Sequence, residues 1–140
     1  MNQFQILANV TSKLFTKEEL PLDFRGYNDF IEKFEHQSSF DAEGLSEIIK
    51  ESILWNDYIS EVINSANILL FSLMADVEAM KANYAPKEKL RVASEKLTML
   101  KTFKREMYIQ KQHCINIYYK TMKTYEKSMN AFTINDYVNV

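Results

Sequence analysis

Residues 45–77, LSEIIKESILWNDYISEVINSANILLFSLMADV, decide the fold class of this 140-residue chain. Small and apolar side chains recur at alternating intervals of three and four, the a/d pattern of a heptad repeat, at Leu45, Ile48, Ser52, Trp55, Ile59, Val62, Ala66, Leu69 and Leu73. Neighbouring positions widen this stripe at Ile49, Ile63, Leu70 and Val77. A further apolar set, Ile68, Phe71 and Met74, lies on another side of the helix. We therefore expect a long helix over 45–84 whose middle is covered from several directions.

A second long helix is predicted over 86–132. Pro86 suits the first turn of a helix, and no Gly or Pro follows it. Its apolar stripe comprises Leu90, Ala93, Leu97, Leu100, Phe103, Met107, Cys114, Tyr118, Tyr125 and Phe132. The register slips near Leu100–Phe103, so we expect no strict heptad. The short link at 83–85 predicts an antiparallel hairpin.

The two ends of the chain have simpler patterns. Helical spacing predicts a helix over about 2–15, a Thr16/Glu19 capping box, a second short helix to about 36 capped by Asn28, and then a polar loop. Residues 1–44 hold seven aromatic side chains, which we expect to cover the hairpin as in a bundle. Residues 1–132 are thus predicted to form a single all-α domain. Residues 133–140, TINDYVNV, predict an extended or disordered tail, or else a strand that joins a partner's sheet.

Composition excludes several classes of protein. Two glycines and two prolines are too few for most all-β folds and for Gly-rich phosphate loops. The longest charge-free run, between Glu61 and Asp76, has 14 residues, fewer than the roughly 20 needed to cross a bilayer. With no signal peptide visible, we expect no transmembrane segment and a cytoplasmic setting by default, with a virion as the alternative.

Residues that could carry catalysis do not converge. The only histidines are His36 and His113, and the Glu32/His36 pair at i,i+4 falls short of a metal-ligand set. Cys114 lies on the apolar stripe, where a buried thiol packs well. We predict no catalytic residues, no metal and no cofactor, and therefore a protein that is not an enzyme.

The formal net charge of −2 hides a polarity along the chain. Residues 1–85 carry 6 basic and 14 acidic side chains, whereas residues 86–140 carry 11 and 5. Opposed charges beside an apolar seam can set pairing within a chain or between chains. Alternatively, a basic helix face can contact the phosphates of a nucleic acid.

These patterns lead to two functional hypotheses. The first is a non-catalytic helical interaction or assembly protein that self-associates or joins a larger complex, with partner-binding candidates Trp55, Tyr58, Ile59, Val62 and Phe71. The alternative is a nucleic-acid-binding accessory protein that uses Lys101, Lys104, Arg105, Lys111, Lys120, Lys123 and Lys127. Enrichment in Lys, Asn, Ile and Tyr is compatible with a low-GC bacterium or one of its phages.

Overall fold

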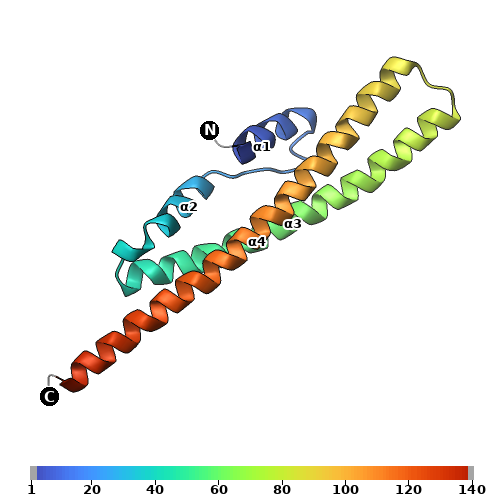
Figure 1. The fold of residues 1–140 in the computed structure, drawn as a ribbon. Helices are drawn as coiled ribbons and strands as arrows, with labels where there is room; N and C mark the ends of the chain where they lie inside the picture. The colour runs from blue at the N-terminus through green and yellow to red at the C-terminus, as the bar shows by residue number, and fades with distance from the viewer. Residues whose placement is uncertain (1–2, 139–140) are drawn as a thin grey trace. The chain divides into compact units, whose positions relative to one another are not determined.

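The structure, a computed structural model, describes the backbone of residues 3–138 and the side chains of residues 3–130. The described part is all-helical: α1 (Gln3–Leu14), α2 (Tyr27–Glu35), the 3-10 helix η1 (Gln37–Ser39), α3 (Ala42–Ala82) and α4 (Lys87–Val138), in the order shown in Figure 1. The long helices α3 and α4 pack against each other, accompanied by the shorter N-terminal helices. The predicted all-α hairpin is therefore confirmed.

Two helix starts differ from the prediction. Helix α3 begins at Ala42 and takes Gly44 into its first turn, because the Asp41 side chain accepts a hydrogen bond from the Gly44 backbone N–H at 2.9 Å. Helix α2 is capped by Gly26, with φ of 85°, and not by Asn28. The left-handed backbone at Gly26 turns the chain into α2 without any side-chain cap.

The segment between α1 and α2 contains the predicted capping box. The Thr16 backbone N–H donates to Glu19 Oε1 at 3.0 Å, and the Glu19 backbone N–H donates to Thr16 Oγ1 at 3.1 Å. The first of these bonds holds the pKa of the Glu19 carboxyl below its ordinary value. The box closes a single turn, since the Leu20 N–H already bonds to the Thr16 carbonyl and Pro21 follows.

A Schellman motif ends α3. The Ala85 N–H bonds to the Met80 carbonyl at 2.9 Å, and the Tyr84 N–H bonds to the Lys81 carbonyl at 3.3 Å. The residue at the left-handed position of this motif is usually Gly, but here it is Tyr84, with φ of 52°. Pro86 then precedes α4, and its carbonyl accepts the Leu90 N–H. This motif makes the reversal between the long helices short.

Helix α4 continues to Val138, so the extended tail expected from residue 133 is not observed over 133–138. No Gly or Pro follows Pro86, and adding a residue to an existing helix costs far less than starting one. Thr133 and Ile134 therefore continue the helix despite their β-branched side chains. Residues 139–140 of the expected tail lie outside the described residues.

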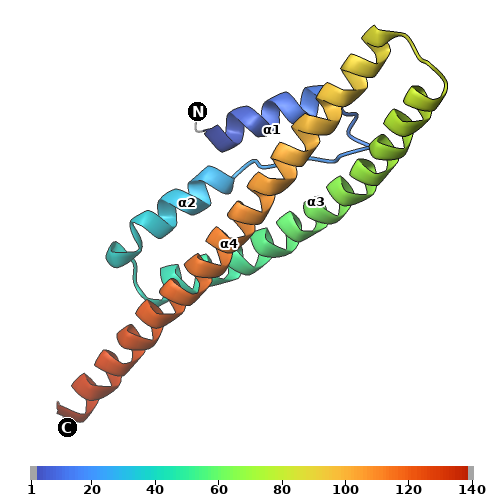
Figure 2. The ribbon, with the colours of Figure 1, turned by 45° about the vertical axis from the view of Figure 1, so that its right-hand side comes forward.

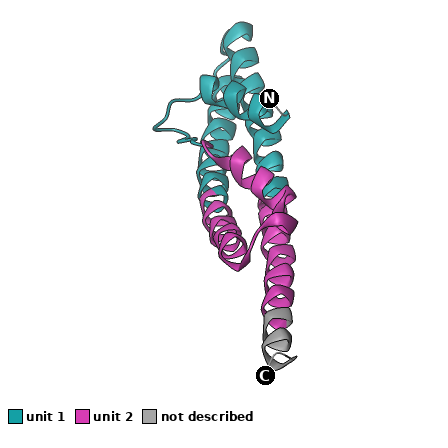
Figure 3. Ribbon diagram, turned by 90° about the vertical axis from the view of Figure 1, so that its left-hand side faces the viewer, with its two compact units in different colours: residues 1–23, 59–110 teal, residues 24–58, 111–140 magenta. Residues whose placement is uncertain are grey.

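The chain separates into two compact units (Figure 3). Unit 1 comprises residues 1–23 and 59–110, and α1 lies beside the first part of α4 in it (Figure 2). Its core is drawn from α1, the following turn, α3 and α4, and includes Phe4, Phe15, Leu20, Ile59, Val62, Ala66, Leu100, Phe103 and Met107. The expected single domain over 1–132 stays a prediction.

Unit 2 comprises residues 24–58 and 111–140. Its core contains Tyr27, Phe30, Leu45, Ile48, Cys114 and Ile117. An exposed ion pair between Lys33 and Glu51, at 2.8 Å, joins α2 to α3, and the Glu51 carboxylate raises the pKa of Lys33. Unit 2 thus closes its core with α2 and the first part of α3.

The buried stripe of α4 is more regular than the sequence indicated. Ala93, Leu100, Met107, Cys114 and Thr121 are all buried and follow one another at intervals of seven. The expected slip near Leu100–Phe103 is therefore wrong. Ile117 and Thr121 are buried, whereas the sequence pattern predicts Tyr118 and Tyr125 at these core positions. The heptad is hard to recognise in the sequence because one of its core residues, Thr121, is polar.

Candidate interaction surfaces

Two of the partner-binding candidates, Trp55 and Tyr58, belong to an aromatic cluster within unit 2. The Trp55 ring stacks on Phe24 with centroids 6.1 Å apart, and it meets Tyr27 edge-on at 5.0 Å. Tyr58 packs edge-on against both Trp55, at 5.8 Å, and Phe24, at 5.4 Å. Both side chains are half-buried, so much of their apolar surface is already covered by this chain.

The other three candidates lie in unit 1 and differ in exposure. Ile59 and Val62 are core residues, 0% and 3% exposed, so neither presents a surface to a partner. Both residues occupy a/d positions of the heptad, which indicated an interface between helices. That interface is the packing of α3 against α4 within this chain, so it is not open to a partner. Phe71 is 72% exposed. Of the five, Phe71 is the residue with a largely open side chain.

Phe71 is part of a wider exposed patch that we call the α3 outer face, formed by Ile68, Phe71 and Met74. Ile68 is 73% exposed and Met74 is 42% exposed. These residues were expected to be covered from another direction, and that expectation is wrong. Beyond Ala66 the buried residues of α3 are Leu70 and Val77, which lie beside the predicted a/d seam at positions expected to widen it. The three side chains therefore stay on the solvent side of α3.

Other exposed apolar side chains occur in a more charged setting. Ile53 and Leu54, 46% and 67% exposed, lie in unit 2 between Glu51 and Asp57. The α3 outer face instead lies within the charge-free run that separates Glu61 from Asp76. Single surface apolar residues are ordinary, whereas a contiguous patch indicates an interaction site.

Unit 1 also contains an apolar groove of about 730 Å³ between α1 and α4. Leu7, Val10 and Leu14 line it from α1, and Val92 and Met99 line it from α4. Polar side chains border it, including Arg91 and Glu95. The sequence does not reveal this groove, because Val10 and Val92 are far apart in the chain and only the folded structure brings their helices together.

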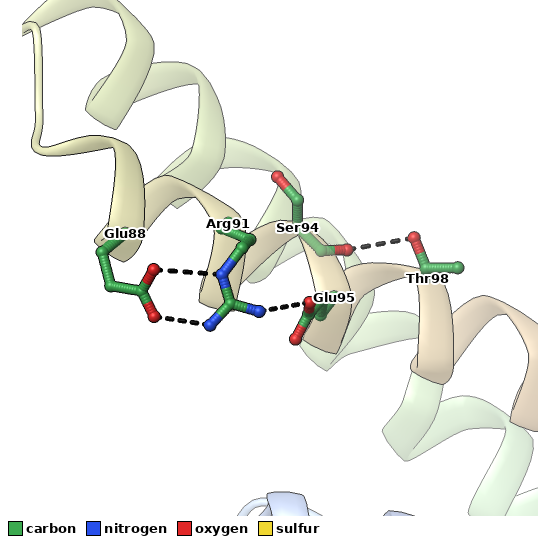
Figure 4. Close-up of polar contacts among 5 residues, drawn as sticks. All are labelled: Glu88, Arg91, Ser94, Glu95 and Thr98. Atoms are coloured by element: carbon green, nitrogen blue, oxygen red, sulfur yellow. Dashed lines mark hydrogen bonds and ion pairs between the residues drawn. The ribbon is translucent and has the colours of Figure 1, made fainter.

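The basic side chains of α4 fall into two kinds. Near the start of the helix, Arg91 binds both oxygens of Glu88 and also donates to Glu95 (Figure 4), which raises the pKa of Arg91. Further along, the nucleic-acid candidates Lys101, Lys104 and Arg105 in unit 1 make no ion pair with any described residue. The same holds for the candidates of unit 2, Lys111, Lys120, Lys123 and Lys127.

Charges on α3 and α4 do not neutralise each other across the hairpin. Among the residues that the structure describes, no ion pair joins the two helices; the pairs of α4 are internal to it, and Glu78 of α3 pairs with Lys81 of the same helix. Glu61 and Asp76 are exposed and have no ion-pair partner in the part of the chain that the structure describes. The polarity seen in the sequence therefore remains on the surface.

Groups capable of chemistry are buried or separated. Cys114 is fully buried, its Sγ lies 3.8 Å from the Tyr27 hydroxyl, and burial raises the pKa of its thiol. His113 contacts the Phe34 ring, and His36 Nδ1 lies 2.9 Å from the carbonyl of Glu32. Within the described residues, no group of His, Cys, Asp and Glu could hold a metal ion.

Helix α3 satisfies one membrane criterion by length and composition. An 18-residue window in it has a mean hydropathy of 1.3, and 22% of that window is buried. Core helices of soluble proteins satisfy the same criterion, so hydropathy alone does not assign α3 to a bilayer. Comparison with known proteins finds no family model that matches the chain, and no curated protein or solved structure that is significantly similar to it.

Proposed function

We propose that this chain is a non-catalytic helical interaction or assembly protein that acts through protein–protein contacts as a structural or accessory component of a larger complex. The observation that carries the proposal is the α3 outer face. Ile68 and Phe71 are each more than 70% exposed although they occupy the middle of a long, well-packed helix. Apolar side chains held in this way lose water contact when a partner covers them, and aromatic residues often dominate such interfaces.

Affinity capture from the native source tests this proposal. The bait is the whole chain, compared with a variant that carries Ile68→Ser and Phe71→Ser. We expect the double variant to lose a specific partner, because both side chains would leave an apolar contact. Tyr84→Ser is the control, since it removes a 94% exposed aromatic ring from the turn and not from the α3 outer face.

Two results would contradict the proposal. Either the double variant retains every partner of the wild-type chain, or the wild-type chain captures none. Urea unfolding of the double variant, with the same midpoint as the wild type, establishes that any loss of binding does not come from unfolding.

A second candidate function is nucleic-acid binding by α4. It is favoured by the side chains of Lys101, Lys104 and Arg105, which make no ion pair with a described residue and are available to phosphates. The test is a titration with duplex DNA at several salt concentrations. We expect Lys101→Glu with Arg105→Glu to weaken binding and to flatten its salt dependence. Absence of binding by the wild type at low salt would exclude this candidate.

A further inference from the structure

The α3 outer face has an acidic border at both ends. Glu61 precedes Ile68 by seven residues and Glu78 follows Phe71 by seven, so each carboxylate lies two turns away on the same side of the helix. Both are exposed. No basic residue occurs between Lys50 and Lys81, and Lys81 is paired with Glu78. A partner that covers this face therefore needs an apolar centre with basic neighbours.

Helix α4 carries a surface of that kind in unit 1. Tyr108 and Ile109 are 50% and 55% exposed. Lys101 precedes Tyr108 by seven residues, and Arg105 precedes Ile109 by four, so both cations share the side of these apolar residues. We call Lys101, Arg105, Tyr108 and Ile109 the α4 basic face. The nearest acid in sequence, Glu106, is half-buried and accepts a hydrogen bond from Gln110 at 3.1 Å.

These two faces remain separate within one chain. Both are exposed to solvent, and no ion pair between described residues connects α3 to α4. Glu61 on the α3 outer face and Lys101 and Arg105 on the α4 basic face thus have no ion-pair partner among the described residues. A second copy of the chain supplies a complement with both the correct apolar residues and the correct sign of charge.

We propose that copies of this chain associate by docking the α3 outer face of one copy on the α4 basic face of the next. This inference rests on the proposed function and names its partner. The interface is heterologous, because the two contacting surfaces differ. An open assembly keeps one unused face of each kind, one at each end, so association continues until a ring closes or a filament forms. Pairing of two α3 outer faces brings no unpaired cation to Glu61, because the nearest basic side chain, Lys81, already pairs with Glu78.

Reciprocal charge reversal tests the proposal on the full chain. One variant carries Glu61→Lys and Glu78→Lys, and the other carries Lys101→Glu and Arg105→Glu. Sedimentation velocity after nuclease treatment measures association of each variant and of their equimolar mixture. Because each reversal opposes like charges across the interface, we expect each variant alone to associate about tenfold or more weakly than the wild type. In the mixture each contact between unlike variants brings opposite charges together, so association is restored in assemblies that alternate the two variants.

Controls separate specific pairing from net charge and from misfolding. Glu18→Lys with Glu35→Lys changes the net charge as much as the first reversal but lies outside α3 and α4, so its association should equal that of the wild type. Phe71→Ser should weaken association without altering the urea midpoint. Added salt should weaken wild-type association, because the charged pairs are at the surface.

Several outcomes would overturn the proposal. These are a monomeric wild type at all accessible concentrations, a variant of α4 that associates as well as the wild type, a mixture that fails to regain association, and association that vanishes with nuclease. A monomeric chain whose Ile68 and Phe71 still capture a different protein overturns this inference alone. Loss of that capture as well would overturn the proposed function.

Discussion

Trp55 and Phe71 are aromatic residues on the same helix, yet Trp55 packs against other rings and Phe71 is exposed to solvent. Trp55 contacts three other rings, with centroids between 5.0 and 6.1 Å away. Phe71 is 72% exposed and has no ring contact among the described residues. The difference is that Phe24 and Tyr27 fold back over Trp55, whereas no described segment covers Phe71. An aromatic residue thus indicates an interaction surface only where the chain leaves it open.

Alanine substitution of one aromatic residue in each region should produce the largest contrast. Phe30→Ala should lower the free energy of unfolding by about 3–5 kcal/mol, because Phe30 is fully buried beside Tyr27 and its removal leaves a cavity. Phe71→Ala should change the free energy of unfolding by less than about 0.5 kcal/mol, because Phe71 is exposed. Urea unfolding of the two variants measures both values. Equal losses would remove the distinction between the regions.

Gly26→Ala tests the turn that places the aromatic cluster. Gly26 has φ of 85°, while a Cβ there would come no closer than 4.0 Å to the Trp55 ring. Space is therefore available, and the cost is backbone strain of about 1–2 kcal/mol. Thermal or urea unfolding should show this loss. An unchanged midpoint would mean that the left-handed turn is not required for packing on Trp55.

Tyr84→Gly tests the other end of the hairpin, beyond the α3 outer face. Tyr84 occupies a left-handed position at φ 52° and is 94% exposed, so the ring contributes little packing. Glycine removes the backbone strain of the left-handed conformation, but it also raises the conformational entropy of the unfolded chain. The net gain in unfolding free energy should be about 0.5–1 kcal/mol. Asn83→Gly is the control, because Asn83 does not have a positive φ. A gain of equal size at Asn83 would contradict this explanation.

Thr121→Val should have the smallest effect and concerns the packed region of unit 2. Thr121 is fully buried, and its Oγ1 has no hydrogen-bond partner among the described residues. Replacing this hydroxyl by a methyl group should raise the unfolding free energy by about 0.5 kcal/mol. Thr11→Val is the matched control: Thr11 is also fully buried, but its hydroxyl donates to the Leu7 carbonyl at 2.7 Å, so no gain is expected. A gain at both positions would point to apolar volume as the cause.

The helical hairpin could be predicted from residues 45–77 and the unbroken stretch after Pro86, because periodicity and chain breakers are local properties. The capping box at Thr16 and Glu19 was equally readable. The first residues of the helices are harder to predict. Helix α3 begins at Ala42 because the Asp41 side chain accepts a hydrogen bond from the Gly44 N–H, and this start depends on that one bond. The heptad in α4 was missed because Thr121 and Ile117, not the tyrosines, face the core.

Of the candidate partner residues, the sequence could identify apolar positions but not their exposure. Ile59 and Phe71 both belong to the apolar pattern of α3, yet one is 0% and the other 72% exposed. Exposure depends on which segments return to cover a helix, and those contacts join residues far apart in the chain.

By itself the sequence determined that this protein is all-helical, that two long helices are joined by a tight turn, and that acidic and basic residues are divided between the two parts of the chain. These properties follow from local spacing and from counting. Tertiary structure alone decided that no ion pair joins α3 to α4 among the described residues and that Ile68 and Phe71 face solvent. The physical reason is that burial and ion pairing require two surfaces to meet, and only the folded chain determines which surfaces meet.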